Sequence, residues 1–512
     1  MRKILIFLLL LCSVAGLFFE RTLVAGTGAT EAHSGIPRFT LEQAILTALQ
    51  RNPDIQRARQ EIERTKGLYL ELRADALPRI DASGGFNATD PHLSRFTGDG
   101  GTSSTVVDPT TGQVISTGQS SGVDQSYDVR IQATQVIFAG GRVVNQIRSA
   151  DFQRDSSYYS FRSTIDQIIA NARTQFYQVL LNRALIGVQE ESIRLLESQL
   201  QDQQNRFEAG TVPRFNVLQA QVAVSNQRPQ LFTARNNYRI AQLQLARTLG
   251  LDFDPRRGDA APLEAIGELR FEPRKIPLAR AIEIAKQRRP FLKAQKATVL
   301  TNSAQVSVAR SGFFPQINAT AGSELLSSPL TLDPHDVRSG YVFGATGNWA
   351  VWDWGQTYGR LKQAKAVLEE SKISLDDASR QVELEVQQAY SNLVQAAELI
   401  RSQEENVGQA EEALRLASAR LGAGAGTQLE VLDARVQVTT AQSTRLQALY
   451  TYSAALAEFD RATATEVTYS NQLDEPRTRN KVRSEAAATP APKPTPLPLN
   501  HAGIREPVAR QH

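Results

Sequence analysis

Hydrophobic residues in this chain follow a helical period over most of its length. Seven-residue spacing runs through two long segments, from about residue 142 to 207 and from about 356 to 421. The two series are Ile165, Ala172, Val179, Ile186, Ile193, Leu200 and Phe207, then Val386, Leu393, Ile400, Val407, Leu414 and Leu421. Sustained heptads predict coiled-coil packing. At ~1.5 Å per residue, a helix of ~66 residues is ~100 Å long, which excludes a compact globular domain.

Shorter helices flank each long one. A glycine-containing turn ends each long segment, and a helix of about half the length is expected to return. Helix-like segments 40–76 and 278–313 precede the long ones, and Thr40 with Gln43 predicts a capping box. Both segments end before a proline, which disfavours helix at the preceding residue. Two half-length helices stacked end to end would match one long helix.

Between these predicted helices, hydrophobic residues recur at every second position. Apolar and polar residues alternate in three segments near 127–134, 317–325 and 341–349, and more weakly in 79–88. The polar positions are Asp128, Arg130, Gln132, Asn318, Thr320 and Glu324. Strands of ~10 residues with one apolar face suit a membrane-spanning β-strand, although a soluble sheet with one buried face has the same pattern. Aromatic residues near the strand ends favour the membrane, and the Gly- and Ser-rich segment 87–126 is expected to be an extracellular loop.

The middle of the chain contains two similar segments in tandem. Residues 41–80 match 278–317, and further on Gly141, Gly210 and Ala220 match Gly355, Gly424 and Ala434. The offset between matched residues is constant over two long stretches and changes once between them, which predicts a tandem duplication. We therefore expect a first structural repeat over 38–250, a linker over 251–277, a second repeat over 278–466, and a disordered Pro-rich tail over 467–512.

Composition narrows the class of protein. Arg2 and Lys3 before an apolar run predict a signal peptide over about 1–25, with an uncleaved anchor or acylation at Cys12 as alternatives. Cys12 is the single cysteine, and the five histidines form no ligand pair, so no metal site or cofactor is expected. Charge is balanced, with 57 basic and 53 acidic residues, which argues against nucleic acid as a partner. No catalytic motif is visible, so the chain is not expected to be an enzyme.

The strands also predict the assembly. Four strands cannot close a barrel, and open sheet edges do not survive in lipid. Two chains would give an eight-stranded barrel filled by side chains, whereas three would give twelve strands and leave a lumen. The expected fold is thus mixed: mostly long coiled-coil α-helices with two β-hairpins, forming a trimeric 12-stranded β-barrel continued by a periplasmic α-helical barrel.

In these features the chain resembles the TolC-type outer-membrane efflux proteins, or outer membrane factors. The resemblance covers residues ~38–466 and is carried by both turn motifs, by Phe138-Ala-Gly-Gly-Arg142 and by Trp352-Asp-Trp-Gly-Gln356. It implies a homotrimeric channel-tunnel in the outer membrane of a Gram-negative-type cell, with its helical tunnel in the periplasm. That channel would passively conduct cargo from a periplasmic adaptor (membrane fusion protein) and an inner-membrane transporter, in tripartite efflux or type I secretion. The alternative is a soluble periplasmic coiled-coil adaptor or scaffold.

The resemblance also implies two sites. The turns that meet the adaptor map to Gly210, Thr211, Val212, Pro213, Gly424, Ala425, Gly426 and Thr427. The periplasmic constriction, an acidic ring in the family, maps to Glu430 and Asp433, with Asn216 and Gln219 at the matching positions of the first repeat. Two local readings stay open: the glycines allow chain reversal, and Thr427-x-x-Glu430 predicts a capping box.

Overall fold

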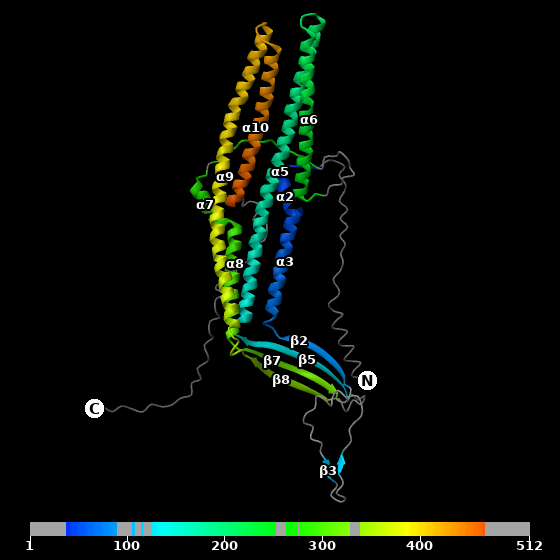
Figure 1. Cartoon of the computed structure of the whole chain (residues 1–512), viewed down its shortest axis with the longest axis vertical. Coiled ribbons are helices and arrows are strands. Elements are labelled where there is room, and N and C mark those ends of the chain that lie inside the picture. Colours follow the sequence, from blue (N-terminus) through cyan, green and yellow to red (C-terminus); the bar gives the residue numbers. More distant parts are fainter. Residues whose placement is uncertain are drawn as a thin grey trace, which may run out of the picture.

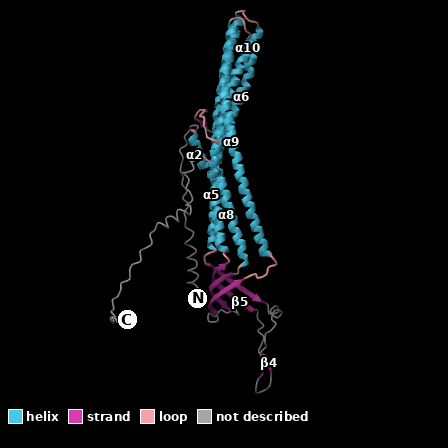
Figure 2. Ribbon diagram, turned by 90° about the vertical axis from the view of Figure 1, so that its left-hand side faces the viewer, coloured by secondary structure: helices cyan, strands magenta, loops and turns pink. Residues whose placement is uncertain are grey.

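The protein is a long rod of helices with a small β-sheet at one end (Figures 1 and 2). The computed structural model describes residues 37–89, 105–107, 114–116, 124–251, 263–274, 276–327 and 338–465. The predicted signal peptide, the predicted tail and most of the loop 87–126 lie outside these residues. Among the described residues, no helix combines the length and the hydropathy needed to cross a membrane.

Two pairs of antiparallel helices form the part of the rod that is remote from the sheet. The long helices have 67 residues each and the returning helices 36 each. Their bounds are α5 Arg142–Glu208, α6 Arg214–Leu249, α9 Gln356–Gly422 and α10 Gln428–Thr463. The heptad spacing therefore predicted both long helices to within one residue at each end.

Shorter helices complete the half of the rod next to the sheet. They are α2 Leu41–Arg51, α3 Pro53–Ala74, α7 Leu278–Arg288 and α8 Pro290–Arg310, with a short 3₁₀ helix Ser311–Phe313 after α8. The predicted capping box is present, since Thr40 N–H donates to Gln43 Oε1 at 3.0 Å and Gln43 N–H to Thr40 Oγ1 at 3.4 Å.

The prediction of one continuous helix in each of these segments was wrong. Both are broken before a proline, at Asn52 and at Arg289, whose ψ angles are 128° and 120°. Proline pushes the preceding residue out of the helical region, while proline itself starts the next helix well because its missing N–H has no helical partner there. The Asn52 side chain also caps α3 by accepting from the backbone N–H of Asp54 at 2.8 Å.

The sheet at the end of the rod has four antiparallel strands in the order β2-β5-β7-β8. Their bounds are β2 Arg79–Thr89, β5 Asp124–Ala139, β7 Gln316–Ser327 and β8 Arg338–Asn348. All four predicted strands are present. Two very small sheets were not predicted, because strands of two or three residues show no period: β1 Arg38–Phe39 with β6 Glu264–Ala265, and β3 Thr105–Val107 with β4 Val114–Ser116.

The register gives the four-stranded sheet one polar and one apolar face. Asp81 pairs with Gln132, and Arg130 pairs with both Ser83 and Glu324. Because side chains alternate along a strand, all six predicted polar positions fall on one face: Asp128, Arg130, Gln132, Asn318, Thr320 and Glu324. The opposite face carries Ile80, Phe86, Val129, Ile131, Leu325, Tyr341 and Phe343.

The apolar core divides between the two halves of the chain. One cluster surrounds α5 and the other surrounds α9. Ile165, Ala172 and Val179 are fully buried, as are Val386 and Ile400. Toward the turns the heptad positions become more exposed, and Phe207 is 43% exposed. The long helices are therefore packed most tightly at mid-height.

Candidate functional site

Both hairpin turns lie at the end of the rod opposite the sheet, and they have the same backbone (Figure 1). Gly210 and Gly424 have φ angles of +71° and +72°, which glycine adopts without strain. Gly210 N–H donates to Phe207 O at 2.9 Å and Thr211 N–H to Arg206 O at 2.9 Å. The second turn repeats these bonds at 3.1 and 2.9 Å, so both are Schellman caps that close the long helix.

The two turns are held by different side chains: in the first, Thr211 Oγ1 donates to Arg206 O at 2.9 Å. In the second, Arg420 donates to the Ala425 carbonyl at 3.3 Å, and its guanidinium is 4.0 Å from Glu430. A Cβ on Gly426 would lie only 3.0 Å from Arg420 Cβ, so this turn is closely packed against α9. The first turn has Val212 and Pro213 at the positions of Gly426 and Thr427. The chain therefore offers two different surfaces at its tip.

The four expected constriction residues occupy the first two turns of α6 and α10. Glu430 and Asp433 are exposed, and Asn216 and Gln219 are half-buried. Glu430 N–H donates to Thr427 Oγ1 at 3.3 Å, which is half of the predicted capping box. Asp433 has no ion pair among the described residues. One chain thus places its amide pair and its acidic pair on separate hairpins at the same end of the rod.

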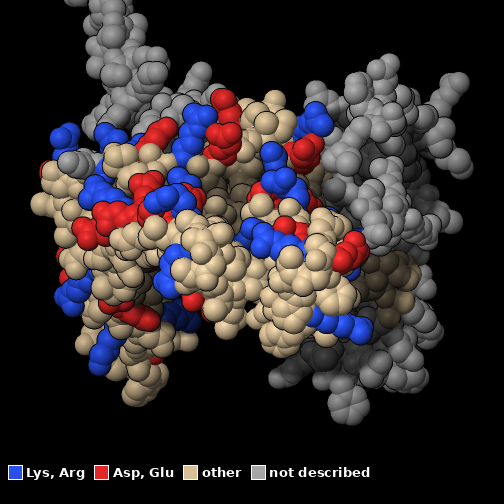
Figure 3. All heavy atoms as spheres, turned by 90° about the horizontal axis from the view of Figure 1, so that it is seen from above, with Lys and Arg blue, Asp and Glu red and all other residues tan. Residues whose placement is uncertain are grey.

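A buried polar seam joins the two hairpins near these residues. Gln203 of α5 and Gln428 of α10 are 3% and 7% exposed, and their side chains meet at 3.5 Å. Leu196, Val224 and Leu432 form a small apolar cluster beside them. The heptad series did not reveal this seam, because Gln428 and Leu432 lie between the chosen heptad positions. Seen from this end of the rod, basic and acidic side chains are mixed over the surface (Figure 3).

A second polar cluster lies at mid-height, and we call it the waist cluster. Its centre is Asp460 of α10, which is 5% exposed. Arg173 of α5 donates to Asp460 at 3.2 Å, Arg274 also donates to it, and Thr465 Oγ1 donates at 3.2 Å. The carboxylate therefore connects the first half of the chain, the segment between the halves and the end of α10.

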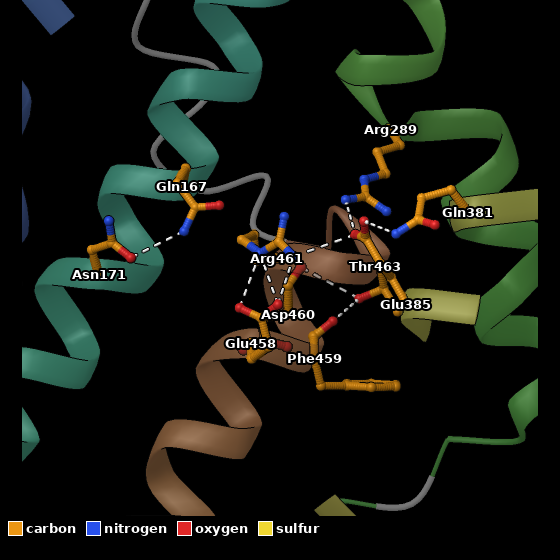
Figure 4. Close-up of polar contacts among 10 residues, drawn as sticks. All are labelled: Gln167, Asn171, Arg289, Gln381, Glu385, Glu458, Phe459, Asp460, Arg461 and Thr463. Carbon is orange, nitrogen blue, oxygen red and sulfur yellow. Dashed lines mark hydrogen bonds and ion pairs between the residues drawn. The ribbon is translucent and has the colours of Figure 1, made fainter. Parts of the chain in front are cut away.

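Beside Asp460, a buried arginine and a carboxylate connect α8 with α9 and α10 (Figure 4). Glu385 accepts from Arg289 and, at 3.4 Å, from Arg461. Burial opposes ionisation of Glu385, but the hydrogen bonds from Arg289 hold the pKa of this carboxyl below its usual value. Gln381 also donates to Glu385, at 3.3 Å.

At the position equivalent to Glu385, the first half of the chain has an amide side chain in place of the carboxylate. Gln167 donates to Asn171 at 3.0 Å (Figure 4), and these two residues match Gln381 and Glu385 in the offset between the halves. Asp166, next to this pair, is half-buried. Burial raises the pKa of Asp166 from 3.8 to about 6, although Arg162, Arg289 and Arg461 act in the opposite direction.

The polar face of the sheet contains a cross-strand ion pair. Arg130 of β5 donates to Glu324 of β7 at 2.8 Å. On the same face Arg79 pairs with Asp81 at 2.9 Å. Such pairs on opposite or neighbouring positions neutralise each other's field. The face is therefore hydrophilic with locally balanced charge.

Aromatic side chains gather where the sheet meets the helices. Trp352 and Trp354 are 75% and 89% exposed and form an edge-to-face pair with ring centroids 5.7 Å apart. Trp349 donates its indole N–H to the Phe313 carbonyl at 3.2 Å. Amphipathic rings of this kind suit the boundary between lipid and water.

An amphipathic sheet continued by a rod of paired helices is the architecture of TolC-like outer-membrane channels. The structure of CusC aligns with this chain with a TM-score of 0.69 at 17% identity, covering 83% of this chain and 91% of that chain. The Campylobacter jejuni CmeC outer membrane channel aligns equally well, with a TM-score of 0.69 at 15% identity, covering 84% and 88%.

Sequence comparison gives the family. Residues 44–251 and 281–465 match the outer membrane efflux protein family, and the chain belongs to it. A probable efflux pump outer membrane protein of Pseudomonas putida, TtgC, is 24% identical over 411 residues, 78% of each chain. The Brucella suis efflux protein BepC is 22% identical over 320 residues, covering 62% of this chain and 68% of BepC. The predicted resemblance and the outer-membrane location are thus confirmed.

Proposed function

We propose that three copies of this chain form a 12-stranded β-barrel in the outer membrane, continued by a periplasmic helical tunnel. This trimer passively conducts cargo that a periplasmic adaptor and an inner-membrane transporter deliver, and the chain catalyses no reaction. Relatives named for antibiotic or solvent efflux support this role, as does the Pseudomonas aeruginosa alkaline protease secretion protein AprF, 25% identical over 305 residues. Efflux and type I secretion are both compatible with it.

The edges of the sheet support a closed assembly. β2 and β8 are the two outer strands of the sheet, and their apolar residues face outward, with Ile80 72%, Tyr341 83% and Phe343 79% exposed. In lipid, unpaired edge groups cost several kcal/mol each, so β8 of one copy must pair with β2 of another. Three copies of this sheet give twelve strands and a lumen lined by the polar face.

The helices support the same assembly and a tandem duplication. The halves proposed over 38–250 and 278–466 each contain a long helix of 67 residues and a returning helix of 36, joined by turns with the same pattern of hydrogen bonds. Leu432 of α10 is 8% exposed because it packs in the cluster with Leu196 and Val224, whereas its equivalent Leu218 of α6 is 48% exposed. The second hairpin of a neighbouring copy would cover Leu218 in the same way.

We infer that the tip of this trimer contains the adaptor contact and the constriction. The two exposed turns, Gly210–Pro213 and Gly424–Thr427, would meet the adaptor. Asp433 and Glu430 would give six carboxylates around the axis, with Asn216 and Gln219 between them. Asp433, which has no ion pair within the part of the chain that the structure describes, carries this proposal best, because Glu430 is partly neutralised by Arg420.

Single-channel recording in a planar bilayer tests both parts. A potential of about one kT at the acidic ring enriches cations and depletes anions about 2.7-fold each. Asp433→Asn should therefore lower the cation-to-anion permeability ratio by up to about sevenfold. Glu412→Gln, an exposed acid of α9 that pairs with Arg415, is the matched control and should change nothing.

If Asp433→Asn leaves the ion selectivity unchanged, the proposed acidic constriction is refuted, but the proposed channel is not. If folded wild-type trimers do not insert and conduct, the channel itself is refuted, and the periplasmic scaffold becomes the better reading.

A further inference from the structure

A hollow of about 620 Å³ lies where the sheet meets the helices. It is bordered by the ends of β5, β7 and β8, the start of α5 and α9, and the end of α8. Gln316 and Asn348, which line it, are register partners on the polar face of the sheet. In the proposed trimer, on which this placement rests, the hollow therefore opens toward the lumen at the inner mouth of the barrel.

Two arginines line this hollow without an ion pair among the described residues. Arg142 is the first residue of α5 and is half-buried, and Arg360 is exposed on the second turn of α9. Asn348 contributes a side-chain amide that has no side-chain hydrogen bond among the described residues. Guanidinium and amide groups are the donors that proteins use for carboxylate and phosphate oxygens.

The carboxylate in the lining is already satisfied by backbone groups. Asp353 Oδ1 accepts from Gly355 N–H at 3.0 Å, and Oδ2 accepts from Thr357 N–H at 2.7 Å. These bonds hold Asp353 as a cap on the start of α9. It lowers the net positive charge of the hollow but does not neutralise both arginines.

Arg142 also borders a second hollow, which contains other acids. There Asp81 is paired with Arg79 at 2.9 Å, and Asp75 is exposed. Asp75 is more than 4 Å from Arg142, since no ion pair joins them among the described residues. Among the described residues in the lining of the first hollow, Asp353 is the one acid against the two arginines, so the lining keeps a net positive charge.

We propose that this hollow binds an anionic group, a phosphate or a carboxylate, between Arg142 and Arg360. Its ligand is a soluble anion of the lumen, such as an acidic group on passing cargo. The position on the polar face favours this source over the phosphate of a membrane lipid, which would reach the apolar face instead. The channel would thus have a positively charged binding site at the mouth of the barrel, remote from the acidic residues at its tip.

The tryptophans make this site directly observable. The chain has three, Trp349, Trp352 and Trp354, and all lie within six residues of Asn348 and within four residues of Asp353, two residues that line the hollow. Intrinsic fluorescence of the full-length trimer in detergent therefore reports on the surroundings of the hollow. Inorganic phosphate and benzoate are the probes, and ionic strength is held constant with chloride.

We expect a saturable change of fluorescence with either probe. The change should be lost in Arg142→Gln/Arg360→Gln and reduced in Arg360→Gln, but kept in the control Arg148→Gln, which alters an exposed arginine of α5 that does not line the hollow. Iodide quenching should fall about two- to threefold in the double variant, given a local potential of about one kT. Quenching by neutral acrylamide should stay the same, which shows that the fold is intact.

Identical, non-saturating responses in all four proteins would overturn the site. A response that appears only with phosphatidylglycerol nanodiscs, and that free phosphate does not compete with, would keep the arginine pair but overturn the soluble ligand. The readout does not depend on conduction. If the trimer conducts but binds neither probe, the anion site is refuted and the channel is not. If the trimer binds a probe but does not conduct, the proposed channel is refuted and the anion site is not.

Discussion

Near the waist cluster lies a carboxyl group, Asp166, whose removal should stabilise the protein. Asp166 of α5 is half-buried and faces Arg162, Arg289 and Arg461, with Glu385 close to the last two. Burial raises its pKa to about 6 from an ordinary value of 3.8. The folded protein therefore keeps a proton on Asp166 at pH values where the unfolded chain has already lost it.

The sign and size of the effect follow from proton linkage. A group with a raised pKa contributes stability below its unfolded pKa, and this stability is lost as pH rises through the folded pKa. At 1.36 kcal/mol per pKa unit, the shift from 3.8 to about 6 costs about 3 kcal/mol above pH 6. Asp166→Asn removes this titration while keeping the size of the side chain. The variant should gain on the wild type between pH 4 and 6 and keep that gain at higher pH.

Thermal unfolding of the purified protein from pH 4.5 to 8 measures this gain. With about 2.1 cal/mol/K of unfolding entropy per residue, 3 kcal/mol corresponds to about 3 °C if ~430 residues unfold together. Asp376→Asn, which changes an exposed carboxyl on α9, is the matched control and should differ from the wild type by a constant amount. A difference between Asp166→Asn and the wild type that is independent of pH would refute the reasoning.

Two further substitutions test the packing at mid-height, each by the midpoint of thermal unfolding. Asp460→Ala removes a 5% exposed carboxylate that accepts from both Arg173 and Arg274 and should cost about 3–5 kcal/mol, while Glu191→Ala in an exposed pair should change little; equal effects would contradict the role of burial. Gly250→Ala should destabilise more than Gly424→Ala. Both glycines have φ above +60°, but only at Gly250 would a Cβ collide with the Arg51 carbonyl; the reverse order would contradict that contact.

The helices and strands were largely predictable because their signals are local. Heptads and the glycine turns set the bounds of α5 and α9, and strict alternation assigned the polar face of β5 and β7. The breaks at Asn52 and Arg289 were also indicated by the sequence, because a proline follows each of these residues. They were missed because the helical period continues across each break, and period alone does not show a change of axis.

The clusters that combine distant residues were not predictable from local pattern. Asp460 meets Arg173 and Arg274, which are 287 and 186 positions away in the chain. The two arginines that line the hollow between the sheet and the helices likewise come from two different helices. A charged residue on a helix is usually solvated, so these partners become visible only when the packing of the helices is known.

Equivalent positions of the two halves of the chain differ in the side chain that they can carry. Gly140 and Trp354 occupy equivalent places before the long helices, and their φ angles are +58° and +54°. A Cβ on Gly140 would lie 2.7 Å from Phe314 Cβ, so the first half requires glycine there. Trp354 is 89% exposed and adopts the same backbone at a cost of about 1–2 kcal/mol. The two halves therefore share the same backbone conformation at this position, while the residues packed around each position decide which side chain that backbone can carry.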